Sequence, residues 1–173
     1  ILLYGADQVP VGEDQRQHIE LTRDLAQRFN ATFGETFVVP EPFIVKATAK
    51  ILDLQQPDKQ MSKSLGGSGC LYLLDDVKVN VKKIRSAVTD SGRDIVYDPK
   101  EKAGVSNLLT ILGALTGRTP EGVAEQYSGR GYGDLKTDVG EAFADLVTPY
   151  REKVFNLLAN PDTLDEVLAE GAK

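Results

Sequence analysis

The sequence has very few of the residues that would indicate a disulfide framework, a metal centre or a membrane protein. Its 173 residues include one cysteine, Cys70, and one histidine, His18, so no internal disulfide can form and His18 has no second histidine or cysteine at metal-ligand spacing. We therefore predict no metal site and interpret His18 as structural or solvent-facing. No apolar run approaches the roughly 20 residues of a membrane span, and no signal peptide opens the chain. A lone cysteine suits a reducing cytoplasm, which is the predicted location.

Length and composition indicate an ordinary globular protein. With 41% hydrophobic and 27% charged residues, the chain can bury one good core or two small ones, and it contains no internal repeat. The net charge of −6 argues against a general nucleic-acid binder, which is usually basic. Basic residues nevertheless gather between positions 78 and 93 against the single acid Asp90: Lys78, Lys82, Lys83, Arg85 and Arg93. This stretch is either a solvated helix face or a local surface for RNA phosphates.

The first 66 residues show the pattern of the tail of a doubly wound, Rossmann-like nucleotide-binding domain. Apolar residues at 9–11 predict a strand that ends in a tight turn, positions 14–29 have the period of a helix with one buried face, and residues 36–39 predict a second strand ended by prolines. Ligands of such sheets bind beyond the carboxyl ends of the strands. This rule places segment 12–15 and the loop at 62–63 near one crevice.

From the glycine run at 66–69 onward the sequence is almost entirely helical, so we predict an α/β domain at 1–66 and an all-α helical bundle at 67–173. The helices are inferred from apolar stripes with helical spacing and from cap residues. They are expected at 77–88, at 105–115 with Gly117 as the cap, after Thr119-Pro120, at 135–157 with a break or kink near Pro149, and from Asp162 onward with Leu164, Val167 and Leu168 inside. Short loops between amphipathic helices favour bundle packing.

A loop at 60–64, with sequence QMSKS, is the first candidate site. Lys63 supplies a mobile positive charge, and Ser62 and Ser64 supply hydroxyl donors. These groups have the chemistry to close over a polyphosphate, since stabilising charge on the leaving phosphates is most of the task in nucleotidyl transfer. Taken alone, a short loop of serine and lysine is more often a solvated turn.

A second candidate is the polar segment VPVGEDQ at 9–15. Asp14 is either a ligand for a ribose hydroxyl or a plain helix-capping carboxylate. Gly12 either allows the backbone to approach a ligand closely or simply makes a turn. Gln15 either reaches a substrate or is a surface helix residue.

Five segments together resemble the class I aminoacyl-tRNA synthetases, and specifically the bacterial tryptophanyl-tRNA synthetases. They are VPVGEDQ at 9–15, QMSKS at 60–64, LLDD at 73–76, RSAVTD at 85–90 and GVSNLL at 104–109, so the resemblance covers nearly the whole chain. In this family a VPVGEDQ run closes the nucleotide pocket and a KMSKS loop binds the phosphates of ATP. The helical domain of the family binds the tRNA anticodon, which is the role implied for 67–173.

The resemblance also implies a set of site residues, with Lys63 as the catalytic one. Nucleotide contacts are implied for Gly12, Glu13, Asp14, Ile51, Gln60, Met61, Ser62, Lys63 and Ser64. The tryptophan pocket is implied for Val9, Val11 and Gln15. Plainer interpretations remain open, because Val9 and Val11 also suit core packing and Ile51 also suits a buried strand.

The reaction that the resemblance implies is amino-acid activation. The carboxylate of tryptophan attacks the α-phosphate of ATP, pyrophosphate leaves, and the adenylate passes to the terminal ribose of tRNA(Trp). The chain contains no acid–base dyad and no nucleophile, and none is required, since the protein contributes positioning and charge stabilisation. ATP with Mg²⁺, tryptophan and tRNA(Trp) are the expected partners, and the parent protein is expected to be a homodimer.

The sequence departs from the family pattern in the loop and at both ends of the chain. Gln60 replaces the first lysine of KMSKS, although Lys59 precedes it, and Leu65 follows where the family more often has a polar residue. The chain starts at Ile1 without the HIGH-like signature of the family, and it stops before the family's last helix. We therefore expect the carboxyl-terminal part of a synthetase, inactive alone.

Two other hypotheses remain. The first is a stand-alone helical RNA-binding or interaction module in which the loop is vestigial, and the glutamine at position 60 favours it slightly. The second is a different adenylate-forming enzyme built on the same fold. The order and spacing of the two polar segments disfavour this last hypothesis.

Overall fold

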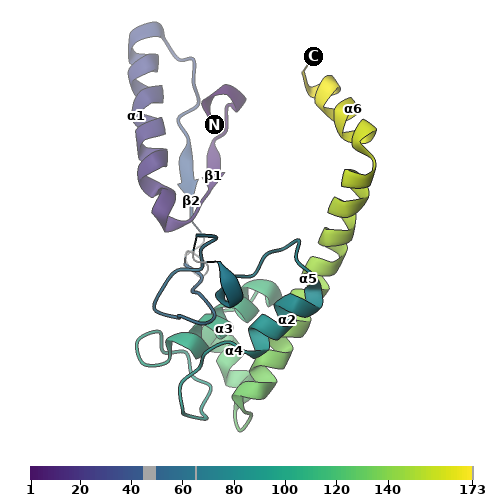
Figure 1. The fold of residues 1–173 in the computed structure, drawn as a ribbon. Helices are drawn as coiled ribbons and strands as arrows, with labels where there is room; N and C mark the ends of the chain where they lie inside the picture. The colour runs from purple at the N-terminus through teal and green to yellow at the C-terminus, as the bar shows by residue number, and fades with distance from the viewer. Residues whose placement is uncertain (45–49, 65, 173) are drawn as a thin grey trace. The chain divides into compact units, whose positions relative to one another are not determined.

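The computed structural model describes residues 1–44, 50–64 and 66–172 and divides into two compact units, Ile1–Ile51 and a unit that begins at Leu52. Figure 1 shows a small α/β arrangement in the first unit and mainly helices in the second. The compact units divide earlier than the domain boundary that we predict after residue 66, because the loop that follows Leu52 is hydrogen-bonded to the helical unit. The boundary at 66 stays a prediction. Leu65 lies outside the described residues.

The first unit is a strand–helix–strand arrangement. Strand β1 (Gln8–Pro10) leads through a 3-10 turn, η2 (Glu13–Gln15), into helix α1 (Arg16–Phe33), and strand β2 (Glu41–Phe43) follows. The strands are parallel, with Val9 opposite Pro42, and Figure 1 shows them beside α1. Two parallel strands need a crossover, which α1 supplies. The predicted strand–turn–helix–strand order is therefore present.

The second strand lies later in the chain than predicted. Residues 36–39 form no strand; the strand is β2, which contains Pro42. The side chain of Asn30 explains the error: its Oδ1 accepts the N–H groups of Thr36 (3.0 Å) and Phe37 (2.9 Å), and its Nδ2 donates to the carbonyl of Phe37 (2.8 Å). Those backbone groups are thus used locally. Pro42 is tolerated because Glu41 donates its N–H to the carbonyl of Asp7, the residue before β1, so the nitrogen of Pro42 faces the other edge.

The second unit consists of helices α2 (Val77–Arg85), α3 (Ala103–Thr116), α4 (Pro120–Ala124), α5 (Tyr132–Ala159) and α6 (Pro161–Gly171), with short 3-10 turns η4 (Gly67–Gly69) and η5 (Glu125–Tyr127). Its core is α3, in which every residue from 105 to 113 is buried. Helix α5 packs against both α2 and α3. Among the described residues, no helix is long and apolar enough to cross a membrane.

Two helix ends follow their sequence signals, and one expectation, about the last helix, fails. Gly117 caps α3 with a left-handed φ of 70°, and Thr119 caps α4 by accepting the N–H of Gly122 at 3.2 Å. Helix α5 runs through Pro149 without a break, and the kink expected there as the alternative stays a prediction. The buried face predicted for the last helix is wrong: Val167 and Leu168 are 64% and 70% exposed, because α6 packs only against the end of α5 among the elements with appreciable contact.

Candidate functional site

Segment 12–15 forms a turn at the carboxyl end of β1. Gly12 has an extended backbone (φ −75°, ψ 165°), which other residues also adopt, and its carbonyl accepts the N–H of Gln15 at 3.0 Å. The first helical residues therefore follow the strand directly. This is the position at which α/β sheets bind ligands.

The side chains of this turn contact their near neighbours. Glu13 accepts two hydrogen bonds from the guanidinium of Arg16, at 2.6 and 3.1 Å, and this pairing lowers the pKa of Glu13 below its ordinary value. Gln15 donates to Asp14 (3.2 Å), and its Oε1 lies 2.7 Å from the Nδ1 atom of His18. Asp14 is not the N-cap of either helix, because Gly12 and Gln15 hold those positions.

The valines of this segment and the histidine of α1 differ in burial. Val9 and Val11 are half-buried, which is compatible with both a pocket wall and core packing. His18 is exposed on α1, in agreement with a solvent-facing role.

The QMSKS segment completes a tight hairpin. Leu52 lies opposite Gln60 in an antiparallel bridge, and Asp53 donates its N–H to the carbonyl of Lys59 at 2.9 Å. The buried carboxylate of Asp53 stabilises the turn by accepting the N–H groups of Gln55 (2.8 Å) and Gln56 (3.0 Å). A carboxylate that accepts successive backbone N–H groups holds a turn in one shape.

Lys63 follows the second arm of this hairpin, at the end opposite the turn, and faces solvent. Lys63 and Ser64 are exposed, and the hydroxyl of Ser62 accepts the N–H of Ser64 at 3.2 Å, which folds the backbone around Lys63. Lys59 is engaged elsewhere, since its ammonium donates to the side chain of Gln56 at 2.6 Å. That Lys59 covers part of the role of the lysine that Gln60 replaces stays a prediction.

The glycines after the loop have different structural reasons. Gly66 and Gly67 have left-handed φ values of 58° and 72°, which favour glycine and fit a hinge. Gly69 instead makes room for Asp53, because a Cβ atom there would lie 1.9 Å from the Asp53 Oδ1 atom. The sequence alone could not separate these roles.

The basic stretch predicted at 78–93 is divided in the structure. Lys78, Lys82 and Arg85 are exposed. Lys83 packs instead: it donates to the carbonyl of Cys70 (2.9 Å) and to Asp75 (3.2 Å), and it lies 5.1 Å from the centroid of the Tyr72 ring. An ammonium group with these partners stabilises the unit and is not free to meet RNA. The expected surface is therefore smaller than the sequence suggested.

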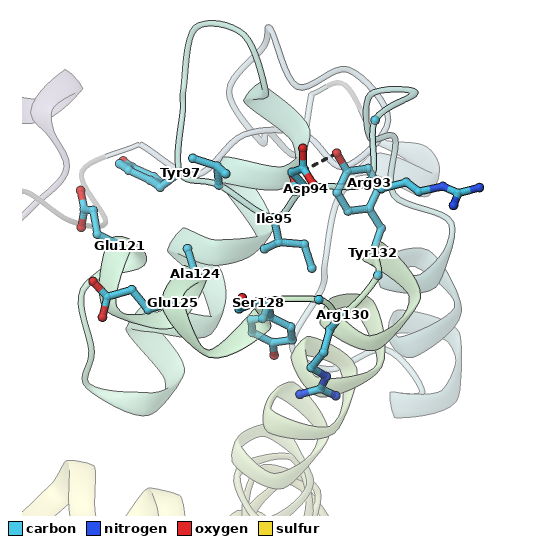
Figure 2. Close-up of a pocket in the computed structure, with 15 residues that line it drawn as sticks. Arg93, Asp94, Ile95, Tyr97, Glu121, Ala124, Glu125, Ser128, Arg130 and Tyr132 are labelled. Carbon is cyan, nitrogen blue, oxygen red and sulfur yellow. Dashed lines mark hydrogen bonds between the residues drawn. The ribbon is translucent and has the colours of Figure 1, made fainter.

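The helical unit also has an open cleft of about 870 Å³ that the sequence interpretation missed. Segment 92–97 forms one wall, and residues from α4 to the start of α5 form the other. Figure 2 shows Tyr97 and Glu121 at one end of the cleft and Arg93, Arg130 and Tyr132 toward the other. The signal in the sequence was the cluster of tyrosines and glycines at 127–133.

A partly buried network of hydrogen bonds around Asp90 supports one wall of the cleft. The Oδ1 atom of Asp90 accepts hydrogen bonds from Tyr132 (2.7 Å), from the N–H of Gly92 (2.7 Å) and from Lys102 (3.1 Å), and Lys102 also donates to Tyr132 at 2.9 Å. Burial raises the pKa of Asp90, but these hydrogen bonds outweigh it and hold the pKa below the ordinary value. The hydrogen bonds to Tyr132 and Asp90 raise the pKa of Lys102. At neutral pH, Asp90 and Lys102 therefore form an ion pair within this network.

Comparison with known proteins gives a consistent result. The family model described as tRNA synthetases class I (W and Y) matches residues 1–148. Tryptophan–tRNA ligase 2 of Streptomyces avermitilis is 58% identical over 174 residues, which is 100% of this chain and 52% of the relative, and the ligase of Mycobacterium leprae is 55% identical with 51% of its length covered. The chain thus spans about half the length of the curated relatives it matches.

Solved structures agree with the sequence comparison. Tryptophanyl-tRNA synthetase from Mycoplasma pneumoniae superposes with a TM-score of 0.73 at 40% identity, over 99% of this chain and 57% of that one. The enzyme from Campylobacter jejuni, solved in complex with ADP and tryptophan, gives a TM-score of 0.64 at 31% identity, over 99% of this chain and 53% of that one.

Proposed function

Because this chain belongs to the class I tRNA synthetases for tryptophan and tyrosine, we propose that it is the carboxyl-terminal part of a tryptophan–tRNA ligase. The observation that carries the proposal is its 58% identity over its whole length to a relative of that name. The proposed whole protein activates tryptophan with ATP and transfers it to tRNA(Trp). A cytoplasmic location and a homodimeric whole protein are parts of the same proposal.

Lys63 is the proposed catalytic residue. When the tryptophan carboxylate attacks the α-phosphorus, the bond to the bridging oxygen breaks and negative charge develops on the leaving pyrophosphate. The exposed ammonium of Lys63 on a turn shaped by Ser62 and Ser64 is suited to neutralise this charge. Gln60 and Met61 complete the proposed phosphate and adenine contacts. Mg²⁺ enters as part of the MgATP substrate, since this ion keeps its waters and binds phosphates more readily than an all-protein cage.

The turn at 12–15 is the proposed site for the rest of the nucleotide. Asp14, which caps no helix, would accept a ribose hydroxyl, and Gly12 and Glu13 would contribute their backbone, because Arg16 engages the Glu13 carboxylate. Ile51 is proposed to meet adenine through its backbone. The proposed tryptophan pocket consists of Val9, Val11 and Gln15.

The proposed role of the helical unit is contact with tRNA(Trp). The exposed basic side chains Lys78, Lys82, Arg85 and Arg93 support it, since phosphates are met by exposed cations. In the full-length protein, combined Lys82→Ala and Arg85→Ala substitutions should raise the KM for tRNA and leave tryptophan-dependent pyrophosphate exchange unchanged. A stand-alone RNA-binding module would lose RNA affinity in the same variant and show no exchange before or after the change.

The experiment that tests the proposal is charging of tRNA(Trp) with tryptophan. The full-length protein should charge it, and residues 1–173 alone should not. Charging of tRNA(Tyr) with tyrosine instead would contradict the proposed amino acid, and RNA binding without charging would support the module.

A further inference from the structure

The side chain of Asn107 holds the base of the Lys63 hairpin. Asn107 lies on α3, 55 residues from Leu52 along the chain, and is only 4% exposed. Its Oδ1 atom accepts the N–H of Leu52 at 2.9 Å, and its Nδ2 atom donates to the carbonyl of Leu52, also at 2.9 Å. One carboxamide thus satisfies both backbone groups of one residue.

Asn107 pairs with the outer edge of the hairpin arm that contains Leu52. The hairpin is joined internally by the bond from Asp53 to Lys59, so the N–H and carbonyl of Leu52 point away from the opposing strand. Asn107 takes the place that a third strand would occupy. Two backbone bonds add to it, from Val88 to the carbonyl of Leu54 (2.7 Å) and from Leu54 to the carbonyl of Gly69 (2.9 Å).

No other common side chain reproduces the contact. The pairing needs one acceptor and one donor on a short planar group, which is the carboxamide of asparagine. Aspartate offers acceptors only and would bring a charge into a buried position. Alanine would leave both groups of Leu52 without these partners.

The base of the hairpin is buried and rigid, whereas Lys63, which follows it, is exposed. Helix α3 is the most deeply buried element of its unit, so Asn107 is held by its packing as well as by its hydrogen bonds. From this base the chain runs through Gln60 to Lys63, which is exposed. A small displacement at the base would therefore move the ammonium of Lys63 away from its working position.

We infer that Asn107 is a positioning residue for the Lys63 loop, which fixes the place of the Lys63 ammonium relative to the phosphates of ATP. The inference rests on the proposed function. It predicts an effect on ATP without an equal effect on tryptophan, because the proposed tryptophan pocket lies in the other compact unit. Misplacement of a charge-stabilising group by about 1 Å can reduce a rate by two orders of magnitude.

The test is steady-state tryptophan-dependent pyrophosphate exchange by the full-length protein with Asn107→Ala. We expect kcat to fall and the KM for ATP to rise, each about tenfold, while the KM for tryptophan stays within about twofold. The hydroxyl of Asn107→Ser can bond only one of the two Leu52 groups at a time. The kcat and the KM for ATP of this variant should therefore lie between those of the wild type and the alanine variant. The serine variant decides the question by the same comparison if the alanine variant does not fold.

Ser106→Ala is the matched control. Ser106 is the preceding residue on α3, is 2% exposed, and accepts the N–H of Asp98 at 2.9 Å, so it also anchors a backbone segment, but not the hairpin. Its loss should lower Tm comparably and leave the ATP parameters within about twofold.

Three results would overturn the inference. They are unchanged ATP parameters in both Asn107 variants, an equal rise in KM for ATP and tryptophan, and an equal kinetic loss in the Ser106 control. In each case an active wild type would leave the proposed function intact. A wild-type protein without tryptophan-dependent exchange would overturn the proposed function and this inference with it.

Discussion

The two segments proposed to contact the nucleotide are held in different ways. The turn at 12–15 is stabilised by neighbours, since Glu13 pairs with Arg16 and Gln15 contacts Asp14 and His18. The Lys63 hairpin is fastened at its base by Asn107, 55 residues away. The turn should therefore respond to changes close by in sequence, and the hairpin to changes far away.

The largest expected effect is at Lys63, just after the hairpin. In the full-length protein, Lys63→Ala should slow adenylate formation by at least about tenfold, which corresponds to roughly 1.4 kcal/mol of barrier. The physical reason is the loss of the cation that is proposed to face the leaving pyrophosphate. The measurement is the rate of pyrophosphate exchange at saturating ATP and tryptophan.

Lys59→Ala is the control for this prediction, because Lys59 is a lysine of the same hairpin whose ammonium already binds Gln56. Lys59→Ala should lower the rate of pyrophosphate exchange much less than Lys63→Ala does. If the two lysine variants lose activity equally, the assignment of the catalytic charge to Lys63 is wrong.

A smaller effect is expected in the turn. Asp14→Ala should raise the KM for ATP severalfold with little change in Tm, because this carboxylate caps no helix and its one hydrogen bond to a described residue comes from Gln15. Titration of ATP in the exchange assay measures it. Asp24→Ala, an exposed aspartate further along α1, is the control and should leave the KM unchanged. A fall in Tm with an unchanged KM would show a structural role for Asp14 instead.

The Asp90 network gives a prediction about stability. At pH 7, Asp90→Asn should lower the free energy of unfolding by about 1–2 kcal/mol, through weakened hydrogen bonds to a charged acceptor. Because the folded pKa of Asp90 lies below its ordinary value of 3.8, its contribution is complete above that value and is lost as pH falls through the folded pKa. The wild type should therefore approach the variant in stability below about pH 4.

Urea unfolding at a series of pH values checks this expectation. Asp94→Asn, an exposed carboxylate in the same segment, should show no such pH-dependent difference from the wild type. A difference between wild type and Asp90→Asn that persists unchanged at low pH would contradict the role given to the ion pair.

The smallest effect is expected for the exposed pair in the turn. Glu13→Gln removes the ion pair with Arg16, and both side chains are largely exposed. Exposed ion pairs contribute little to stability and are screened by salt. The midpoint of urea unfolding should stay within error of the wild type, and a clear shift would show that the turn is less locally held than its contacts indicate.

The sequence predicted elements whose signals are local. Gly117 and Thr119 ended and began helices as expected, and the strand–helix–strand order was present. Residues 36–39 had a strand composition, but the side chain of Asn30 occupies two of their backbone N–H groups, so the strand formed later. Such a competitor is invisible to a pattern of apolar residues.

The candidate site shows the same limit. Lys63 and Asp14 were found from short motifs, whereas Lys83 lay in a basic run and proved to pack against Tyr72 and Asp75. Asn107 lay within the GVSNLL segment without a visible role, because its partner is far away in sequence. Long-range hydrogen bonds carry no periodicity, and the sequence could not predict them.

The decisive measurement is pyrophosphate exchange into ATP by the full-length protein, with tryptophan and with tyrosine in parallel. We expect exchange that depends on tryptophan, does not occur with tyrosine and falls sharply in Lys63→Ala. Exchange with neither amino acid, or an unaltered rate in Lys63→Ala, would contradict it.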